Sequence, residues 1–142
     1  MAKQMVMIRT YRQRITIIKY RKPVESTINQ ELQWVGNSLG LFNLRDKDKS
    51  CFRLFIEMLK AAKSRRVMSS DELGYRLGLT RGTIIHHLNR LIESGLVVRD
   101  GNRYFLRVES LSSLIDEVER DIKQTCEDLR KVAEDIDEKL GL

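Results

Sequence analysis

Three side chains in the segment 81–94 combine chemistry that suits contact with a nucleic acid. Thr83, His86 and Arg90 offer a hydroxyl, an imidazole and a guanidinium group, which hydrogen-bond to base edges or to phosphates. On a helix these three positions lie together on the side opposite Leu88. The spacing therefore predicts a helix whose outer side can read base edges in the major groove of DNA.

The same helix carries a dry side that would hold it against the rest of the protein. With Leu88 at zero and about 100° per residue, four further apolar side chains fall within about 60° of it. These are Ile84, Ile85, Leu91 and Ile92. The buried stripe fixes which side of the helix can face a ligand.

Residues beside the polar triplet extend the predicted contact surface. Gly82 has no side chain, so it lets a phosphate approach the helix N-terminus closely. Arg81 and His87 are expected to hold flanking phosphates or bases, with Arg81 projecting close to the apolar stripe. The predicted recognition helix spans about residues 81–94.

A second, shorter helix is predicted just upstream, over about residues 69–77. Ser69 is a good N-cap, and Glu72 stands three residues later, which is the spacing of a capping box. Gly78 supplies the stop that a tight turn needs, and Thr80 then caps the recognition helix. Two helices joined by a short turn that contains glycine form the arrangement that places its second helix in the major groove.

The segment 96–107 predicts a β-hairpin after the recognition helix. The dipeptide Asp-Gly at Asp100 lies between two runs of β-prone residues, which is a strong turn signal. Arg99, Arg103 and Arg107 place cations on this hairpin. We therefore expect it to lie along the DNA backbone as a wing.

With these motifs, residues 50–107 resemble a winged helix-turn-helix domain of the arsenic-repressor (ArsR) type, and similar regulators are common in archaea. The run from Thr83 to Val97 follows the family's recognition-helix pattern almost position for position. The resemblance covers about two fifths of the chain. It implies a mainly α fold with a small β-hairpin, namely a winged helix-turn-helix (α+β), and binding to double-stranded DNA.

The metal-sensor role of some ArsR-type proteins is not carried over to this chain. Metal-sensing members have a cysteine cluster on the helix before the recognition helix, whereas residues 71–78 contain no cysteine. Other members bind metal through His and acidic residues on the C-terminal helix, and residues 110–140 contain no His. We therefore predict no metal and no cofactor.

Catalytic chemistry also lacks a basis in the sequence. Cys51 and Cys126 form neither a CxxC pair nor part of a His cluster, and Cys51 fits a small buried hydrophobe. Adjacent His86 and His87 diverge by about 100° on a helix and cannot chelate a metal. The chain has no phosphate loop, dinucleotide fingerprint or nucleophile elbow, so we predict no enzymatic activity.

The C-terminal segment 110–140 predicts a long coiled-coil-like helix, because apolar residues recur there with a seven-residue period. The predicted dimerisation seam consists of Leu111, Ile115, Val118, Ile122, Leu129, Val132 and Ile136, with Thr125 as its polar member. The partner is expected to be the same helix of a second copy, since a homodimer suits two DNA half-sites. The alternative is a helix that folds back on its own domain.

Charge separates the chain into basic and acidic parts. Residues 1–25 hold seven Lys or Arg and one Glu, a net +6. Residues 26–107 hold fourteen and eight, again +6, whereas residues 108–142 hold five and eleven, a net −6. A polyanion would meet the first two parts and be repelled by the third, as expected for a DNA-contacting body with a remote acidic helix.

These observations divide the chain into four parts. They are 1–25, a basic N-terminal arm or short strands; 26–47, a short helix and linker; 48–108, the DNA-binding domain; and 109–142, the dimerisation helix. The N-terminal alternatives are two strands over Met5–Arg12 and Ile15–Tyr20, a disordered basic arm, or a true start further downstream at Met5 or Met7.

The sequence as a whole predicts a homodimeric, sequence-specific DNA-binding regulator of transcription. A cytoplasmic location is expected, since no apolar run is long enough to span a membrane and no signal peptide is recognisable. Two alternatives remain open: a chromatin-like protein that coats DNA without reading it, and a winged-helix module that binds protein. An RNA-binding role is disfavoured because aromatic residues make up only 6% of the chain.

Overall fold

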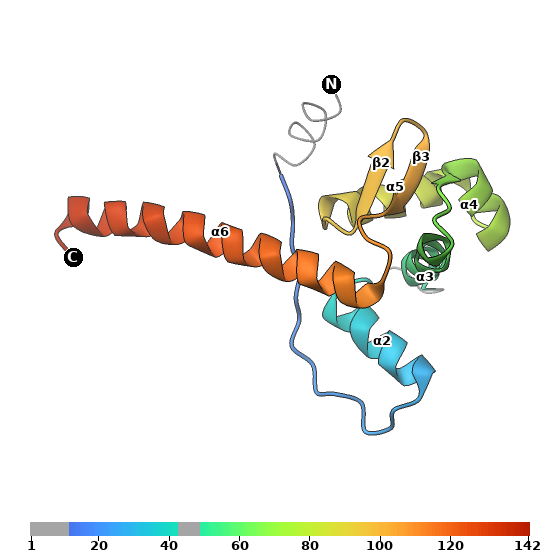
Figure 1. Cartoon of the computed structure of the whole chain (residues 1–142), viewed down its shortest axis with the longest axis horizontal. Helices are drawn as coiled ribbons and strands as arrows, with labels where there is room; N and C mark the ends of the chain where they lie inside the picture. Colours follow the sequence, from blue (N-terminus) through green and yellow to red (C-terminus); the bar gives the residue numbers. More distant parts are fainter. Residues whose placement is uncertain (1–11, 43–48) are drawn as a thin grey trace.

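The described part of the chain is mainly helical and includes a small sheet. The computed structural model describes residues 12–42 and 49–142, and Figure 1 shows their arrangement. The elements are α2 (Ile28–Ser38), α3 (Ser50–Lys63), β1 (Met68–Ser69), α4 (Ser70–Leu77), α5 (Arg81–Glu93), β2 (Val97–Asp100), β3 (Arg103–Leu106) and α6 (Leu111–Leu140). The elements from α3 to β3 cluster together, and α6 projects from them as a long single helix (Figure 1).

Helices α4 and α5 form the predicted helix-turn-helix. At the start of α4, Ser69 Oγ accepts the backbone N–H of Glu72 at 3.1 Å. At the start of α5, Thr80 Oγ1 accepts the backbone N–H of Thr83 at 3.3 Å. Gly78, between the two helices, has a φ of 66°, a left-handed conformation that glycine adopts without strain. The predicted N-caps at Ser69 and Thr80 and the stop at Gly78 are thus confirmed.

A three-stranded antiparallel sheet with the order β1-β3-β2 completes the domain. Strands β2 and β3 form the predicted hairpin, with Val97 opposite Leu106 at its base. Strand β1 adds a pairing of Met68 with Tyr104 that the sequence did not indicate, because two residues are too few to show a period. The fold is a winged helix-turn-helix with a long C-terminal helix, which confirms the predicted fold class.

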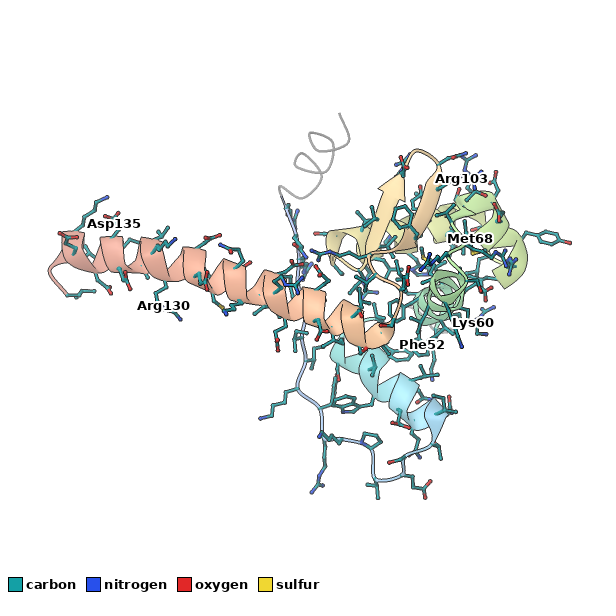
Figure 2. The ribbon with its side chains drawn as sticks, in the orientation of Figure 1. Phe52, Lys60, Met68, Arg103, Arg130 and Asp135 are labelled. Carbon is teal, nitrogen blue, oxygen red and sulfur yellow. The ribbon has the colours of Figure 1, made fainter. Side chains whose placement is uncertain are left out.

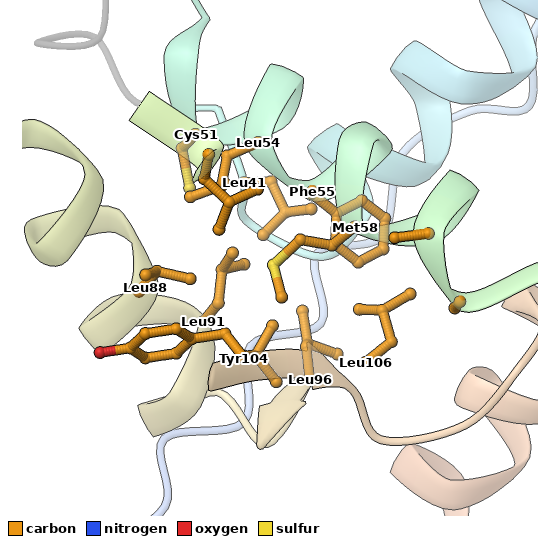
Figure 3. Packing of buried hydrophobic residues seen from close by; sticks show 14 of the residues in the cluster. Leu41, Cys51, Leu54, Phe55, Met58, Leu88, Leu91, Leu96, Tyr104 and Leu106 are labelled. Atoms are coloured by element: carbon orange, nitrogen blue, oxygen red, sulfur yellow. The ribbon is translucent and has the colours of Figure 1, made fainter. Parts of the chain in front are cut away.

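The hydrophobic core lies between α3, α5 and the sheet (Figure 3). Leu54 and Phe55 of α3 pack in the same cluster as Leu88 and Leu91 of α5, and all four are at most 1% exposed. Burying one such side chain contributes about 1.5–3 kcal/mol. The apolar stripe of α5 therefore fixes the rotation of this helix, and with it the side that faces outward.

The segment Gly36–Gly40 favours a break in the helix, because it contains two glycines, but α2 continues to Ser38. Gly36 continues the helix because its missing side chain allows a close approach. A Cβ atom there would stand 2.7 Å from ring carbons of Phe42 and Phe52. The two rings also pack on each other, with centroids 4.7 Å apart. The glycine thus serves packing rather than a turn.

An extended N-terminal segment, residues 12–20, crosses the domain, and we call it the strap. The backbone N–H of Arg14 donates to the Glu93 carbonyl at the end of α5, at 2.8 Å. The backbone N–H of Ile18 donates to the Ser38 carbonyl at the end of α2, also at 2.8 Å. The strap is therefore held at two helix ends.

The strap corrects one N-terminal expectation. A strand over Ile15–Tyr20 was one alternative, but this segment pairs with helix ends and not with a sheet edge, so it forms no ladder. The described contacts of this stretch include the backbone bond of Ile18 and, just before the stretch, that of Arg14. The other candidate strand, Met5–Arg12, lies outside the described residues except for Arg12.

The first third of α6 is bound to the body of the domain, and the remainder projects away from it (Figure 1). Leu114 and Val118 are 0% and 4% exposed. Arg107, just after β3, donates to Asp121 of α6, and its second terminal nitrogen lies 3.1 Å from Asp121 Oδ1. The hydrogen bond from Arg107 holds the pKa of Asp121 below its usual value, and the bond from Gln13 of the strap acts in the same direction. Asp121 therefore joins the wing, the strap and α6.

Candidate nucleic-acid interface

The outer face of α5 consists of Gly82, His86 and Asn89, all of which are exposed. Imidazole and amide groups three residues apart point to the same side and offer donors and acceptors for base edges. Among the described residues, no atom lies within 4 Å of the place where a Cβ of Gly82 would stand. A phosphate can therefore reach the first N–H groups of the helix.

Thr83 and Arg90, two members of the predicted triplet, are only half exposed because each already has a partner. The Thr80 hydroxyl donates to Thr83 Oγ1 at 2.9 Å, and a terminal nitrogen of Arg90 donates to the Gly40 carbonyl. A guanidinium group carries five N–H donors, so Arg90 keeps donors for a ligand. It lines an open groove together with His86.

His87 lies inside the domain, which corrects its predicted contact with flanking phosphates. It is 6% exposed, and its Nε2 is 2.6 Å from Ser50 Oγ at the start of α3. Its position is about 100° from Leu88 on the helix, and α3 covers that side as well as the stripe. The imidazole of His87 therefore joins α5 to α3, and only the neighbouring His86 faces outward.

Arg99 and Arg103 of the wing are exposed, whereas Arg107, the third cation predicted on the hairpin, is half-buried and paired with Asp121. Figure 2 shows Arg103 near the outer end of the hairpin, away from the core. Arg99 Nε donates to the Gly101 carbonyl in the turn at 2.7 Å, and its guanidinium carbon lies 5.7 Å from the ring centroid of Tyr104. Arg81 is exposed too, because it begins α5 and its angular position near the stripe does not bury it.

Asn89 is a candidate that the sequence analysis missed. The signal was present, since Asn89 follows His86 by three residues and shares its side of the helix. The centre of the predicted triplet lies about 60° around the helix axis from the centre of the exposed face. The reason is that the chain at Gly40 covers the Arg90 side of α5, a contact that the periodicity of α5 cannot reveal.

The structure divides the predicted dimerisation seam into two parts. Val118 is buried in its own domain, and Leu111 and Ile122 pack against that core, so these three residues serve the same chain. This corrects the assignment of Val118 to a contact with a second copy. The remaining apolar members of the seam are at least 41% exposed, namely Ile115, Leu129, Val132 and Ile136.

The described residues offer no evident metal site. Within 12–42 and 49–142, no three His, Cys, Asp or Glu side chains come together so as to hold an ion. Cys51 is fully buried and Cys126 is exposed on α6. In the same part of the chain, every helix is too short or too polar to cross a bilayer.

A helix-turn-helix with an exposed polar face on its second helix and arginines on a wing is the arrangement with which winged helix-turn-helix proteins bind DNA. Consistent with this, the family model of bacterial regulatory proteins of the arsR family matches residues 56–98, from within α3 to within β2. The match covers fewer than a third of the residues and supports an ArsR-like, DNA-binding helix-turn-helix in this segment. Searches of curated proteins and of solved structures returned no match.

Proposed function

We propose that this protein is a sequence-specific, DNA-binding regulator of transcription that acts as a homodimer. The observation that carries the proposal is the outer face of α5, where His86 and Asn89 stand exposed beside the open space at Gly82. This face belongs to the segment that matches the arsR family model. In the proposed complex, α5 lies in the major groove and the wing lies on the backbone.

Base recognition in this complex falls to the middle of α5. Asn89 can bond an adenine edge with both atoms of its amide, and His86 can donate or accept. Arg90 reaches a base with the N–H donors that its bond to Gly40 leaves unused, and Thr83 faces the same side of the helix about two turns earlier. Sequence preference is expected to depend mostly on His86 and Asn89, because both side chains are exposed.

Phosphate contacts surround this centre. Arg81 and the first N–H groups of α5 near Gly82 would contact phosphates of one DNA strand. Arg99 and Arg103 on the wing would contact phosphates elsewhere on the DNA backbone. Phosphate contacts position the protein without reading sequence, so these groups are expected to set affinity and salt dependence.

Dimerisation is proposed through the exposed second half of α6. Leu129, Val132 and Ile136 continue the same apolar row that packs against the body at Ile122. Three such side chains in a row on one helix favour a matching row on a second helix. A dimer would present two copies of α5 to half-sites about 34 Å apart.

The proposal assigns a role to each part of the chain. Residues 48–108 bind DNA and 109–142 dimerise, while 26–47 form the short helix and linker that lead into the domain. Because a regulator of transcription works where the DNA is, we propose a cytoplasmic location. The archaeal origin that the resemblance favours stays an expectation.

Selection of binding sites from a random DNA pool tests the function. The selected duplex is then titrated against a scrambled duplex at about 150 mM salt. We expect a pseudo-palindromic site that binds about a thousandfold tighter than the scrambled one. Equal binding of both duplexes would instead support a chromatin-like coat, and binding of neither would support a protein-interaction module.

Sedimentation equilibrium tests the dimer. The variant with Leu129→Gln and Ile136→Gln removes two exposed apolar members of the seam and is expected to be monomeric. Lys131→Gln, on the outer side of the same helix, is the matched control and should remain dimeric. A double variant that dimerises like the wild type would exclude this seam as the interface.

A further inference from the structure

The strap lines grooves next to the outer face of α5 and is fixed by bonds to the end of α5, to α2 and to α6. Besides the backbone bonds of Arg14 and Ile18, Gln13 Nε2 donates to Asp121 Oδ2 at 3.1 Å. At the far end of the strap, Trp34 Nε1 donates to the Tyr20 carbonyl at 3.4 Å. Figure 1 shows this segment running alongside the domain near the end of α5. Its side chains are therefore held at a set position relative to α5.

Two open grooves separate the strap from the elements of the proposed DNA interface. One groove is lined by Arg12 of the strap and Arg99 of the wing. The other is lined by Arg14 of the strap and by His86 and Arg90 of α5. Asn89 lines both grooves, as does Glu93. Each groove thus has a strap cation on one wall and a proposed DNA-contacting group on the other.

We infer that the strap is a third DNA-contacting element, in which Arg12 and Arg14 bind backbone phosphates on either side of Asn89. The inference rests on the proposed function and names phosphate ligands that neither the helix-turn-helix nor the wing includes. Arg14 is exposed, and the Arg12 side chain is 79% exposed. A groove with guanidinium groups on both walls suits a phosphodiester chain, which arginine binds with two parallel hydrogen bonds.

Glu93 explains how these cations are held when DNA is absent. Its carboxylate lies 3.5 Å from Arg12 Nε, and its backbone carbonyl accepts from Arg14. An exposed ion pair of this kind is weak, so a phosphate can replace the carboxylate as the partner of Arg12. Glu93 also places a negative charge beside both grooves, which opposes DNA.

The test measures DNA affinity of the full chain as a function of salt concentration, with a selected duplex and with a random-sequence duplex. The variant R12Q,R14Q is compared with the wild type and with K19Q,K22Q, which removes two exposed strap or near-strap cations that line neither groove. If Arg12 and Arg14 each neutralise a phosphate, the slope of log K against log salt falls by about 2, and affinity at 150 mM salt falls about tenfold or more. K19Q,K22Q should stay close to the wild type.

Two further variants separate phosphate contact from a structural effect. R12K,R14K keeps both charges and should retain a slope near that of the wild type, whereas a loss equal to that of the glutamine variant would overturn the phosphate assignment. E93Q removes the competing carboxylate and should bind either duplex more tightly. Unchanged or weaker binding by E93Q would contradict the exchange of partners at Arg12.

The outcomes also distinguish this inference from the function on which it rests. Absence of salt-dependent DNA binding by the wild type would overturn the proposed function, and the strap inference with it. Binding by the wild type with equal slopes for R12Q,R14Q and K19Q,K22Q would overturn the strap inference alone. A slope lowered by R12Q,R14Q only would support both.

Discussion

Helices α5 and α6 both carry a continuous apolar row, but the domain buries or partly buries every member of the α5 row and leaves much of the α6 row exposed. On α5, Ile84, Leu88 and Leu91 are all 0% exposed. On α6, Val118 is 4% exposed, whereas Ile115 and Leu129 are 41% and 64% exposed. Similar patterns in the sequence thus meet different surroundings in the fold.

This difference separates two uses of an amphipathic helix. A fully covered row fixes a helix in one rotation, so its opposite face becomes a defined surface, as at His86 and Asn89. A row that extends beyond its own domain leaves apolar surface in water, which favours a partner. The charges agree, because the domain with α5 is basic and the region with α6 carries a net −6.

The largest expected effect compares one leucine from each row. Leu88→Ala leaves a cavity in the core and should lower the free energy of unfolding by about 2–5 kcal/mol. Leu129→Ala should lower that of the monomer by less than about 0.5 kcal/mol, because the side chain is 64% exposed there. Denaturant unfolding measures both. If Leu88→Ala and Leu129→Ala lowered the free energy of unfolding equally at every protein concentration, Leu129 would be buried within its own chain, and the comparison of the two rows would be wrong.

The next effect concerns Asp121, which lies where the covered part of α6 ends. Asp121→Asn weakens the pair with Arg107 and should lower the free energy of unfolding at pH 7 by about 2 kcal/mol. The pKa of Asp121 is lowered in the folded state, so its contribution is present above the ordinary value of 3.8 and is lost as pH falls through the folded-state value.

Unfolding curves of wild type and Asp121→Asn at several pH values check this prediction. The gap between the two proteins should close as the pH falls below about 4, because the wild-type carboxylate is then protonated as well. Asp116→Asn, at an exposed position on the same helix, is the control and should show little difference at any pH. A gap that persists in acid would contradict the ion-pair explanation.

An effect of similar or smaller size is expected at the polar faces of the two helices, opposite their apolar rows. Asn89→Ala should weaken binding to the selected DNA by about 1–3 kcal/mol and relax preference at one base pair, without loss of stability. Gln124→Ala, on the polar side of α6, should leave binding unchanged. Fluorescence titration with matched and mismatched duplexes measures the affinity and the base preference of both variants. Equal effects of the two variants would exclude Asn89 from base recognition.

Local signals explain how much of the fold could be predicted. Ser69, Gly78 and Thr80 determine helix ends through contacts within four residues, and Asp100 with the following glycine determines the hairpin turn. Such contacts can be recognised from spacing alone. Strand β1 and the course of the strap depend on partners far along the chain, so no local pattern indicated them.

The candidate site was harder to predict for the same reason. The period of α5 gave the buried stripe correctly, but the width of its exposed side depends on the neighbours that cover its flanks. Ser50 from α3 lies against His87, and Gly40 lies against Arg90. Because these two contacts cover the His87 and Arg90 sides of α5, the exposed side is centred nearer to Asn89. This difference depends on tertiary structure and not on the sequence of α5.

The smallest expected effect compares the N-caps of the two helices. Thr80 Oγ1 accepts the N–H of Thr83 at 3.3 Å, and Ser110 Oγ accepts the N–H of Ser113 at 3.2 Å. Thr80→Ala and Ser110→Ala should each lower the free energy of unfolding by about 1 kcal/mol, because each leaves one N–H group without its cap. Thermal unfolding measures that loss.

The two caps should differ in their effect on DNA. Thr80 holds the end of α5 that we place against a phosphate, so Thr80→Ala is expected to weaken binding as well, whereas Ser110→Ala acts only on the stability of α6. Ser110→Ala is therefore the control, because it is expected to lower the free energy of unfolding by the same amount. If both variants bind DNA equally well at a temperature where both are folded, the start of α5 does not lie against the DNA backbone. The docking of α5 would then have to rest on its middle, around His86 and Asn89.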